Sequence, residues 1–585
     1  MEEFFTHADV VAIFAIYAIS LNLLLGVAGQ ISIAHAAFGA VGAYSTGYLV
    51  VIQDWSFFPA FWVGIAAALV VGLLMSLPAL YLDVRYLILL TLALSTALLA
   101  VVGAIPELGG SYGLRDVPNL EIFGTTYDDP SEFFRPLIVL ALLVLAICSL
   151  IAYSPYGRVL RAIRDDELAT RGVGKNVILY KVTVFGITSA MAGLAGIMLL
   201  YFNRSAQPGA FDLAVSMQII AMVVIGGAGN LLGSILGATL LVLLEPFLQD
   251  VVNMSPTNAA LTQLTIYGAL IAAFLLVRPQ GLLPESWTPA AAVRALRRSP
   301  PERPESEEVA PPKPSPRLAE TAGPPPTSDG GNPEAVLEAS DLKKYFGGIH
   351  AADGLSLRLP RGRVTGLIGP NGAGKTTVFN LLTGVIPLDE GKVWLHGQDI
   401  TGWTLNRIAN AGMARSYQDV RIYPRMSVLE NVMIAVPDQP GERLPNALFR
   451  RIRTHEGEKE ARQKALEHLE FVGLSARADK LAGELAFGEQ KVVALARLLA
   501  TEAEVLLLDE PASGIDIDWV ETMLGLIAEL RERGKSICVV EHNLHVVERI
   551  ADSVYFMETG TITAEGTVRE LMQQERLAEV YFGSA

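Results

Sequence analysis

A short run in the second half of the chain has the residue types and spacing that bind a phosphate group. It reads Gly369-x4-Gly374-Lys375-Thr376 and lies between a strand-like apolar stretch and a helix-like one. Glycines let successive main-chain N–H groups turn toward one point, and the following helix adds the positive end of its dipole. Lys375 can reach the β- and γ-phosphates of a nucleotide, and the Thr376 hydroxyl can coordinate Mg²⁺. We therefore predict a phosphate-binding loop rather than an ordinary glycine-rich turn. The expected nucleotide contacts are Asn371, Gly372, Ala373, Gly374, Lys375, Thr376 and Thr377.

Two carboxylates, Asp509 and Glu510, close a second apolar run that begins at Val505. We expect a buried strand whose tip places Asp509 beside the phosphate-binding loop, where it can hold Mg²⁺ directly or through water. Glu510 can then polarise the water that attacks the phosphate. Carboxylates are costly to bury unpaired, so a metal ion or a proton should accompany them. Phe346, at the end of an earlier predicted strand, is a candidate to stack on the base; a core aromatic is the alternative.

Composition divides the chain into two unlike halves. Its 585 residues are too many for one domain, and the apolar fraction of 51% and mean hydropathy of +0.40 average an apolar half with an ordinary charged one. The net charge of −15 argues against nucleic acid as a partner. Cys148 and Cys538 lie in apolar segments of different halves, so we interpret them as core residues facing a reducing compartment.

The first half consists of apolar stretches long enough to cross a membrane, which takes about 17–25 residues. Its acidic start and its repeated apolar runs argue against a cleavable signal. Glycines are dense in these stretches, which favours closely packed membrane helices. A broken or re-entrant segment is the alternative for 212–250. The predicted spans, nine give or take one, are 8–27, 33–52, 58–80, 86–105, 136–153, 177–202, 212–229, 231–250 and 261–277.

Charge in the short loops predicts the orientation of these spans. Loop 154–176 is basic and loop 106–135 is acidic, which places the first in the cytoplasm and the second outside. A nucleotide-binding domain after the last span then also lies in the cytoplasm, where ATP is. Residues 286–335 are rich in proline and polar residues and should form a disordered tether. We expect a transmembrane domain at 1–285, this linker, and an α/β nucleotide-binding domain at 336–585.

With these motifs in place, residues 336–585 resemble an ABC-transporter nucleotide-binding domain, an α/β P-loop NTPase. The resemblance implies that Gln418 senses the γ-phosphate, contacts Mg²⁺ and faces the membrane domain. It also implies that His542, at the end of the next predicted strand, is the switch histidine, and that Asp516 belongs to the D-loop. Glu510, His542 and Gln418 are thus the catalytic candidates, and Thr376, Gln418 and Asp509 the metal candidates.

The signature motif departs from the family pattern. Where the family usually has Leu-Ser-Gly-Gly-Gln, this chain has Leu485-Ala-Phe-Gly-Glu-Gln490, so the serine hydroxyl is replaced by Ala486. The resemblance implies that Leu485, Gly488 and Glu489, at a helix beginning near Glu489, contact ATP held by a partner ATPase. A heterodimer with two unequal sites would accommodate the substitution.

Residues 10–283 resemble a membrane subunit of the branched-chain amino-acid (LIV-type) importers, on the strength of 20–44, 222–230 and 278–282. Segment 156–169 is similar to the coupling helix that docks near Gln418; a solvated amphipathic loop is the alternative. Polar residues within spans line a transport path or bond between helices, and both readings stay open. The candidates are Asn22, Gln30, Ser32 and His35.

The two resemblances together imply a permease fused to an ATPase in an ATP-driven importer of a prokaryotic inner membrane. ATP and Mg²⁺ are the implied cofactors. The implied partners are a second permease subunit, a second ABC ATPase subunit, an extracytoplasmic binding protein, a small amino-acid substrate and membrane lipid, with no nucleic acid. Urea, short amides or an aromatic acid remain alternative cargoes, and an exporter half-transporter is a less favoured class.

Overall fold

The computed structural model describes residues 2–78, 84–287, 334–574 and 576–577. These residues form two compact units. The helical unit comprises Met1–Arg164, Val177–Arg303 and Glu442–Arg451, and the α/β unit comprises Asp165–Asn176, Pro304–Gly441 and Ile452–Ala585. Each half of the chain thus contributes one short segment to the unit formed mainly by the other half. The predicted tether falls almost entirely on 288–333, outside the described residues.

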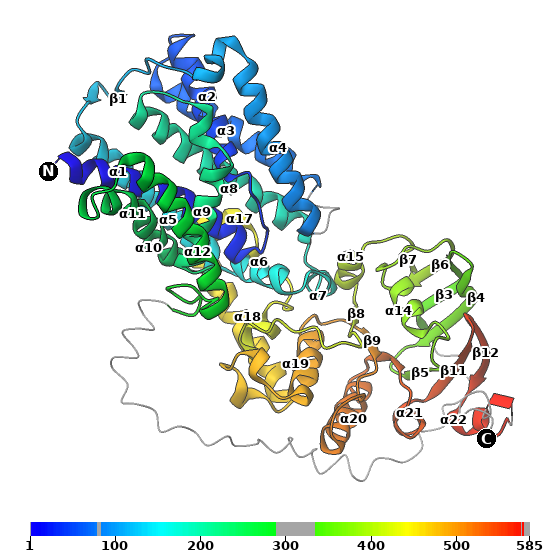
Figure 1. Cartoon of the computed structure of the whole chain (residues 1–585). Coiled ribbons are helices and arrows are strands. Elements are labelled where there is room, and N and C mark those ends of the chain that lie inside the picture. Colours follow the sequence, from blue (N-terminus) through cyan, green and yellow to red (C-terminus); the bar gives the residue numbers. More distant parts are fainter. Residues whose placement is uncertain (1, 79–83, 288–333, 575, 578–585) are drawn as a thin grey trace, which may run out of the picture. The chain divides into compact units, whose positions relative to one another are not determined.

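The helical unit is built from long apolar helices, coloured blue to green in Figure 1. Within the described residues, eight helices are long and apolar enough to cross a membrane. This agrees with a polytopic membrane domain. Including the shorter ones, the α-helices of this part of the chain are α1 (Glu2–Asn22), α2 (His35–Val51), α3 (Phe57–Ser76), α4 (Val84–Ala104), α5 (Pro130–Ala152), α6 (Pro155–Asp165), α8 (Val177–Asn203), α9 (Leu213–Gly226), α10 (Leu231–Val242), α11 (Leu244–Pro246) and α12 (Pro256–Val277).

The predicted span at 33–52 is the one that does not join these eight. It forms α2, whose 17 residues give a length of about 25 Å, against about 30 Å for the hydrocarbon core. Most of α2 is buried, and it packs between α3 and α8. Its 17 residues are the lower end of the length that can span a bilayer, so the predicted count of nine spans, give or take one, stays a prediction. The spans predicted at 212–229 and 231–250 are separate, and a turn at Gly227–Asn230 joins α9 to α10.

This turn is held by the side chain of Asn22, at the end of α1. The Asn22 Nδ2 atom lies 2.8 Å from the carbonyl oxygen of Asn230 and 2.7 Å from Ser234 Oγ, and its Oδ1 accepts from the N–H of Gly229 at 2.7 Å. Gly229 has φ of +88°, which favours glycine. Behind the turn, a side chain on Gly226 would start 2.1 Å from the carbonyl oxygen of Gly233. Asn22 thus forms hydrogen bonds with main-chain groups of the turn that apolar side chains could not form.

Replacing Asn22 with alanine should destabilise the helical unit. Each main-chain group left without its partner costs about 1–3 kcal/mol when buried, and rather less in membrane bundles. We expect the apparent Tm of the detergent-solubilised chain to fall by several degrees. Asn258→Ala, an exposed position on α12, is the control. Equal melting of the two variants would show that the Asn22 contacts contribute no stability.

The α/β unit contains two sheets (Figure 1, lime to red). The larger has the strand order β12-β11-β5-β10-β9-β8 and is parallel from β8 to β11, with β12 antiparallel at its edge. Its members are β5 (Val364–Ile368), β8 (Met413–Arg415), β9 (Val505–Asp509), β10 (Ser536–Val540), β11 (Ser553–Glu558) and β12 (Thr561–Gly566). The smaller, antiparallel sheet has the order β4-β3-β6-β7, with β3 (Ala335–Phe346), β4 (Ile349–Pro360), β6 (Glu390–Leu395) and β7 (Gln398–Asp399).

All residues of β5, β9 and β10 are buried, as expected for central parallel strands covered on both faces. Because these strands run in one direction, their carboxyl ends meet along one edge, and the segments after β5, β8, β9 and β10 meet there. Helices connect the strands of both sheets. They are α14 (Lys375–Leu382), α15 (Leu405–Asn410), α16 (Val428–Met433), α18 (Arg451–Phe471), α19 (Phe487–Leu499), α20 (Ile517–Glu532), α21 (Leu544–Ile550) and α22 (Val568–Met572).

Candidate nucleotide site

The predicted phosphate-binding loop connects β5 directly to α14. Gly369, Gly372 and Gly374 all have positive φ, of 152°, 81° and 103°. Two of them also lie against main chain. A side chain on Gly369 would start 2.1 Å from the Met557 carbonyl oxygen, and one on Gly374 would start 2.5 Å from that of Ala351. The glycines are therefore needed for both the curvature and the packing of the loop.

Lys375 is the first residue of α14 and lies under the loop. Its Nζ atom donates to the carbonyl oxygens of Gly369 at 2.8 Å and Pro370 at 2.9 Å. Burial lowers the pKa of Lys375, and the charges of Glu510 and Asp509 oppose that effect. Among the neighbouring loop residues, Ala373 is buried, whereas Asn371, Gly372 and Thr376 are exposed. The loop thus presents polar groups outward over a buried cation, which suits a polyphosphate.

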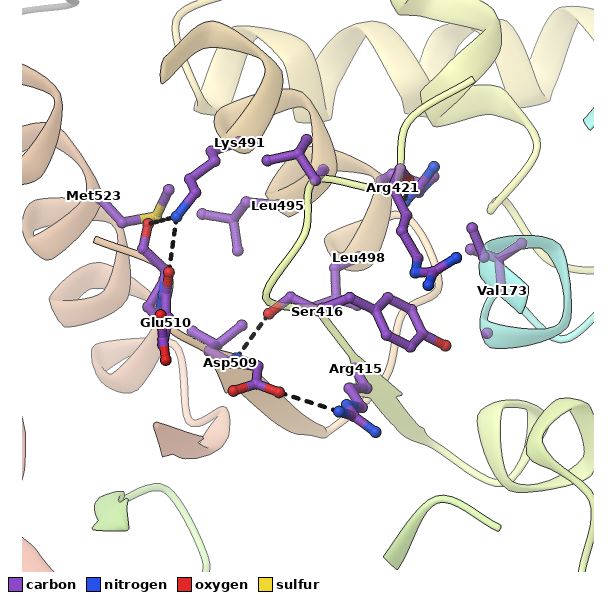
Figure 2. A pocket seen from close by; sticks show the side chains of 18 residues that line it. Val173, Arg415, Ser416, Arg421, Lys491, Leu495, Leu498, Asp509, Glu510 and Met523 are labelled. Carbon is purple, nitrogen blue, oxygen red and sulfur yellow. Dashed lines mark hydrogen bonds and ion pairs between the residues drawn. The ribbon is translucent and has the colours of Figure 1, made fainter. Parts of the chain in front are cut away.

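Asp509 ends β9 with its side chain fully buried. One oxygen, Oδ2, pairs with Arg415 at 3.1 Å (Figure 2), while Oδ1 is buried without a hydrogen-bond partner among the described residues. Burial raises the pKa of Asp509, and Arg415 opposes this effect. An unpartnered carboxylate oxygen and a threonine hydroxyl are oxygen ligands of the kind that Mg²⁺ prefers. Asp509 and Thr376 therefore fit the metal role proposed for them.

Glu510 follows Asp509 and meets two of the predicted residues. Its Oε1 atom lies 2.7 Å from His542 Nε2 and 3.3 Å from Gln418 Nε2. The three residues come from the segments after β9, β10 and β8, so the parallel edge brings them together as expected. Glu510 has φ of +48°, and its N–H donates to the Val540 carbonyl oxygen at 2.8 Å. The arrangement can hold Glu510 as a base while two donors steady one of its oxygens.

Lys491, on α19, was not predicted as a site residue. Its buried Nζ donates to the carbonyl oxygen of Glu510 at 2.8 Å (Figure 2) and to that of Ser513 at 2.5 Å. It therefore ties the signature helix to the turn that carries the base. Burial lowers the pKa of Lys491, while Glu541 and Glu510 oppose this. Arg415 was missed as well. Neither has a local sequence signal, because the partners of both come from distant segments.

The signature residues, Leu485 to Gln490, lie at the start of α19 and not among the residues that contact Glu510. α19 begins at Phe487, two residues before the predicted start, because the Ala486 N–H donates to Glu489 Oε2 at 3.1 Å and caps the helix. The other oxygen of Glu489 pairs with Arg477 at 3.2 Å. Leu485 is buried, Gly488 lies against Trp519, and Asp516 is exposed at the start of α20. Across the described residues, no hydrogen bond or ion pair joins Leu485, Gly488, Glu489 or Asp516 to the phosphate loop.

Phe346 lies at the end of β3 with its side chain 46% exposed, which does not fit the alternative of a core aromatic. Lys344 Nζ lies 5.6 Å from the centre of its ring. An exposed ring remains accessible to a base.

The polar candidates of the helical unit have unlike surroundings. Asn22 is fully engaged by the α9–α10 turn, and His35 Nε2 lies 2.8 Å from Ser20 Oγ. Ser32 Oγ accepts from the N–H of Ala34 at 3.3 Å. Gln30 is buried, and among the described residues neither polar atom of its amide has a partner. The Nδ1 atom of His35 is likewise buried without a partner among the described residues. Gln30 and His35 are therefore the candidates with unused hydrogen-bonding capacity, whereas Asn22 contacts the turn between two helices.

Comparisons with known proteins divide along the same boundary. Residues 4–275 match the family described as the branched-chain amino acid transport system permease component, and 352–513 match the ABC transporter family. A branched-chain amino acid transport ATP-binding protein, BraF of Pseudomonas aeruginosa, is 35% identical over 43% of this chain and 98% of its own length. Its counterpart LivG of Salmonella typhimurium is 36% identical over 43% and 99%. A nucleotide-free ABC-transporter cassette of known structure is 33% identical, with a TM-score of 0.38, over 43% of this chain and all of its own.

Removing the base without removing the loop should separate binding from hydrolysis. Glu510→Gln keeps the size and hydrogen-bonding pattern near His542 and Gln418, so ATP binding should be unchanged. Hydrolysis should fall by about 10²–10⁴, the usual contribution of a positioned general base. ATP affinity and steady-state phosphate release measure the two effects. Lys375→Ala, which removes the cation of the loop, should weaken both. Unchanged turnover in Glu510→Gln would assign the base to another residue.

Proposed function

Because this chain belongs to the family of branched-chain amino acid ABC transport proteins, and joins a permease component to an ATP-hydrolysing ABC ATPase, we propose that it couples ATP hydrolysis to the uptake of branched-chain or similar small amino acids. In this proposal a binding protein delivers the substrate on the outer side. The helical unit provides the path and the α/β unit provides the energy.

The observation that carries the proposal is the packing of segment 165–176 in the α/β unit. This segment lies between α6 and α8 in sequence and forms α7 (Glu167–Gly172). Asp166 caps α7 through Ala169 and pairs with Arg421 at 2.8 Å. Thr170 Oγ1 donates to Tyr423 Oη at 3.2 Å, and Asn410 Nδ2 donates to the Gly174 carbonyl oxygen at 3.0 Å. We expected one helix over 156–169; instead α7 is a separate element.

The same segment borders the catalytic carboxylates. Ala169, Gly172 and Val173 line a cavity of about 40 Å³ together with Asp509 and Glu510 (Figure 2). Tyr417 and Arg421, which flank Gln418 in sequence, complete the wall on the segment's side. Gln418 in turn contacts Glu510. A displacement of this segment would therefore be transmitted to the base through few intervening residues. A change at the base would in turn displace the segment, because coupling between two sites is reciprocal.

We assign the chemistry of the site to residues of this chain. Lys375 and the loop N–H groups would bind the phosphates, and Glu510 would take the proton of the attacking water, steadied by His542 and Gln418. Thr376 and Asp509 would hold Mg²⁺, with Gln418 beside them; the ion supplies charge neutralisation on the phosphates. The basic loop 154–176 supports a cytoplasmic position for this side of the chain.

A second permease subunit and a second ABC ATPase subunit would complete the transporter. The ATPase partner would use this chain's signature motif, whose Ala486 lacks the usual hydroxyl, so two unequal ATP sites are expected. Nothing in the sequence selects the cargo among branched-chain amino acids, urea, short amides and aromatic acids. Exporter-type chains usually have about six spans with long cytoplasmic helical extensions, so the eight long apolar helices of the described residues and the short loops favour import over export.

A pull-down of the full chain in mild detergent tests the assembly. We expect recovery of a second permease and a second ATPase, and hydrolysis that rises when a binding protein and leucine are added. Stimulation by urea, an amide or an aromatic acid instead would reassign the cargo. A homodimer that hydrolyses ATP unaided would contradict the importer and favour the exporter class.

A glycine substitution tests the coupling segment itself. Gly174 has φ of +84°, and a side chain there would start 2.0 Å from Asn410 Oδ1. Gly174→Ala should therefore displace the segment and reduce substrate-stimulated hydrolysis severalfold, while basal hydrolysis persists. Gly534→Ala is a matched control, since Gly534 has φ of +81° and nothing within 4 Å of the added atom. Equal stimulated rates in both variants would exclude segment 165–176 as the coupling element.

A further inference from the structure

One segment from the second half of the chain belongs to the helical unit. It is Glu442–Arg451, which contains the short helix α17 (Leu444–Phe449). α17 packs against α5, and Tyr180 Oη donates to the carbonyl oxygen of Glu442 at 3.0 Å. The segment is thus fixed to the bundle at the end where α5 leaves and α8 enters.

The level of this attachment follows from helix length. α8 has 27 residues and is about 40 Å long, roughly 10 Å more than the hydrocarbon core of a bilayer. Tyr180 lies in its first turn, and its ring centre is 4.7 Å from that of Tyr156. Tyrosines gather at the level of the lipid headgroups, where one end of the ring is apolar and the other is wet. Glu442 and α17 therefore lie at the membrane–water interface.

The surface that the segment presents is apolar and cationic together. Phe449 is 83% exposed, although it is the last apolar residue of α17. Arg443, Arg450 and Arg451 are exposed as well, and no ion pair involves them among the described residues. In a chain of net charge −15, three exposed arginines beside an exposed aromatic ring complement a partner that is anionic and has an apolar portion next to its charge.

We propose that Arg443–Arg451 binds anionic phospholipid of the cytoplasmic leaflet, with the guanidinium groups on headgroup phosphates and Phe449 inserted at the acyl boundary. Arginine forms paired hydrogen bonds with phosphate, and basic residues next to membrane helices are drawn to anionic lipid. An aromatic ring at this depth gains apolar contact without crossing the membrane. This segment from the ATPase half would then hold to both the bundle and the lipid surface. The inference rests on the membrane position of the helical unit, and not on cargo or hydrolysis.

A fluorophore at Phe449 reads the contact directly. The full chain carrying Phe449→Cys, labelled with an environment-sensitive dye, is placed in nanodiscs of phosphatidylcholine with or without phosphatidylglycerol. We expect a blue-shifted emission and quenching by acyl-chain doxyl lipids, at least about twofold stronger with phosphatidylglycerol. Ile517→Cys, an apolar site that is 80% exposed in the α/β unit, should stay water-like. Cys148 and Cys538 are buried, and the unsubstituted chain gives the background.

Charge removal tests the headgroup recognition. In the labelled chain, Arg450→Ala with Arg451→Ala should abolish the preference for phosphatidylglycerol, whereas Arg358→Ala with Arg462→Ala, two other exposed arginines, should keep it. A water-like spectrum in all discs would overturn the proposal. Equal quenching in both lipids would overturn the recognition of anionic headgroups, and a shift that appears only after adding another transport subunit would assign this face to protein. None of these readings depends on ATP turnover, so the proposed function is tested separately.

Discussion

The α/β unit depends on the compensation of two carboxylates buried at the end of one strand. Asp509 ends a strand that is buried throughout and Glu510 follows it, in a region where an unpaired charge is costly. Three cations from three elements lie close to these carboxylates. Arg415 pairs with Asp509, and burial lowers the pKa of Lys375 while the charges of Glu510 and Asp509 oppose that effect. Lys491 donates to the main-chain carbonyl oxygen of Glu510. Because parallel strands end at one edge, each element reaches the site by ordinary sheet topology.

These contacts leave one carboxylate oxygen of Asp509 available to a ligand. Oδ2 of Asp509 is occupied by Arg415, so the unpartnered Oδ1 is what a metal ion can use. On Glu510, His542 and Gln418 both meet Oε1. Gln418 lies between Tyr417 and Arg421 in sequence, and these two border segment 165–176, so the hydrogen bond from Gln418 to Glu510 lies beside that segment. Under the proposed function, the base and the coupling segment would therefore meet at one short stretch of chain.

The residues that the sequence could indicate are those with a local pattern around them. Lys375, Gln418, Glu510 and His542 come after strands and Asp509 ends one, so parallel strand order brings them to one edge. Their roles at a nucleotide stay predictions. Arg415 and Lys491 escaped prediction because a buried cation is recognised only by its partners, which lie 94 and 19 residues away. The predicted nine spans, give or take one, are compatible with the eight long apolar helices among the described residues, and apolar composition alone does not show whether the 17-residue α2 is a ninth. Glu489 caps its own helix, and its predicted contact with ATP held by a partner ATPase stays a prediction.

Segment 165–176 joins the α/β unit through both apolar and polar contacts. Val173 belongs to the apolar core of that unit, and the polar contacts include the Arg421–Asp166 ion pair and the hydrogen bonds of Thr170 and Gly174. A partly exposed ion pair contributes about 0–1 kcal/mol, so the buried apolar contact is the larger stabilising contribution. Because the permease and ATPase components share one polypeptide, their association is intramolecular, which raises the effective concentration of each for the other. Under the proposed function, pairing of the two components would therefore not depend on the strength of any single contact of this segment.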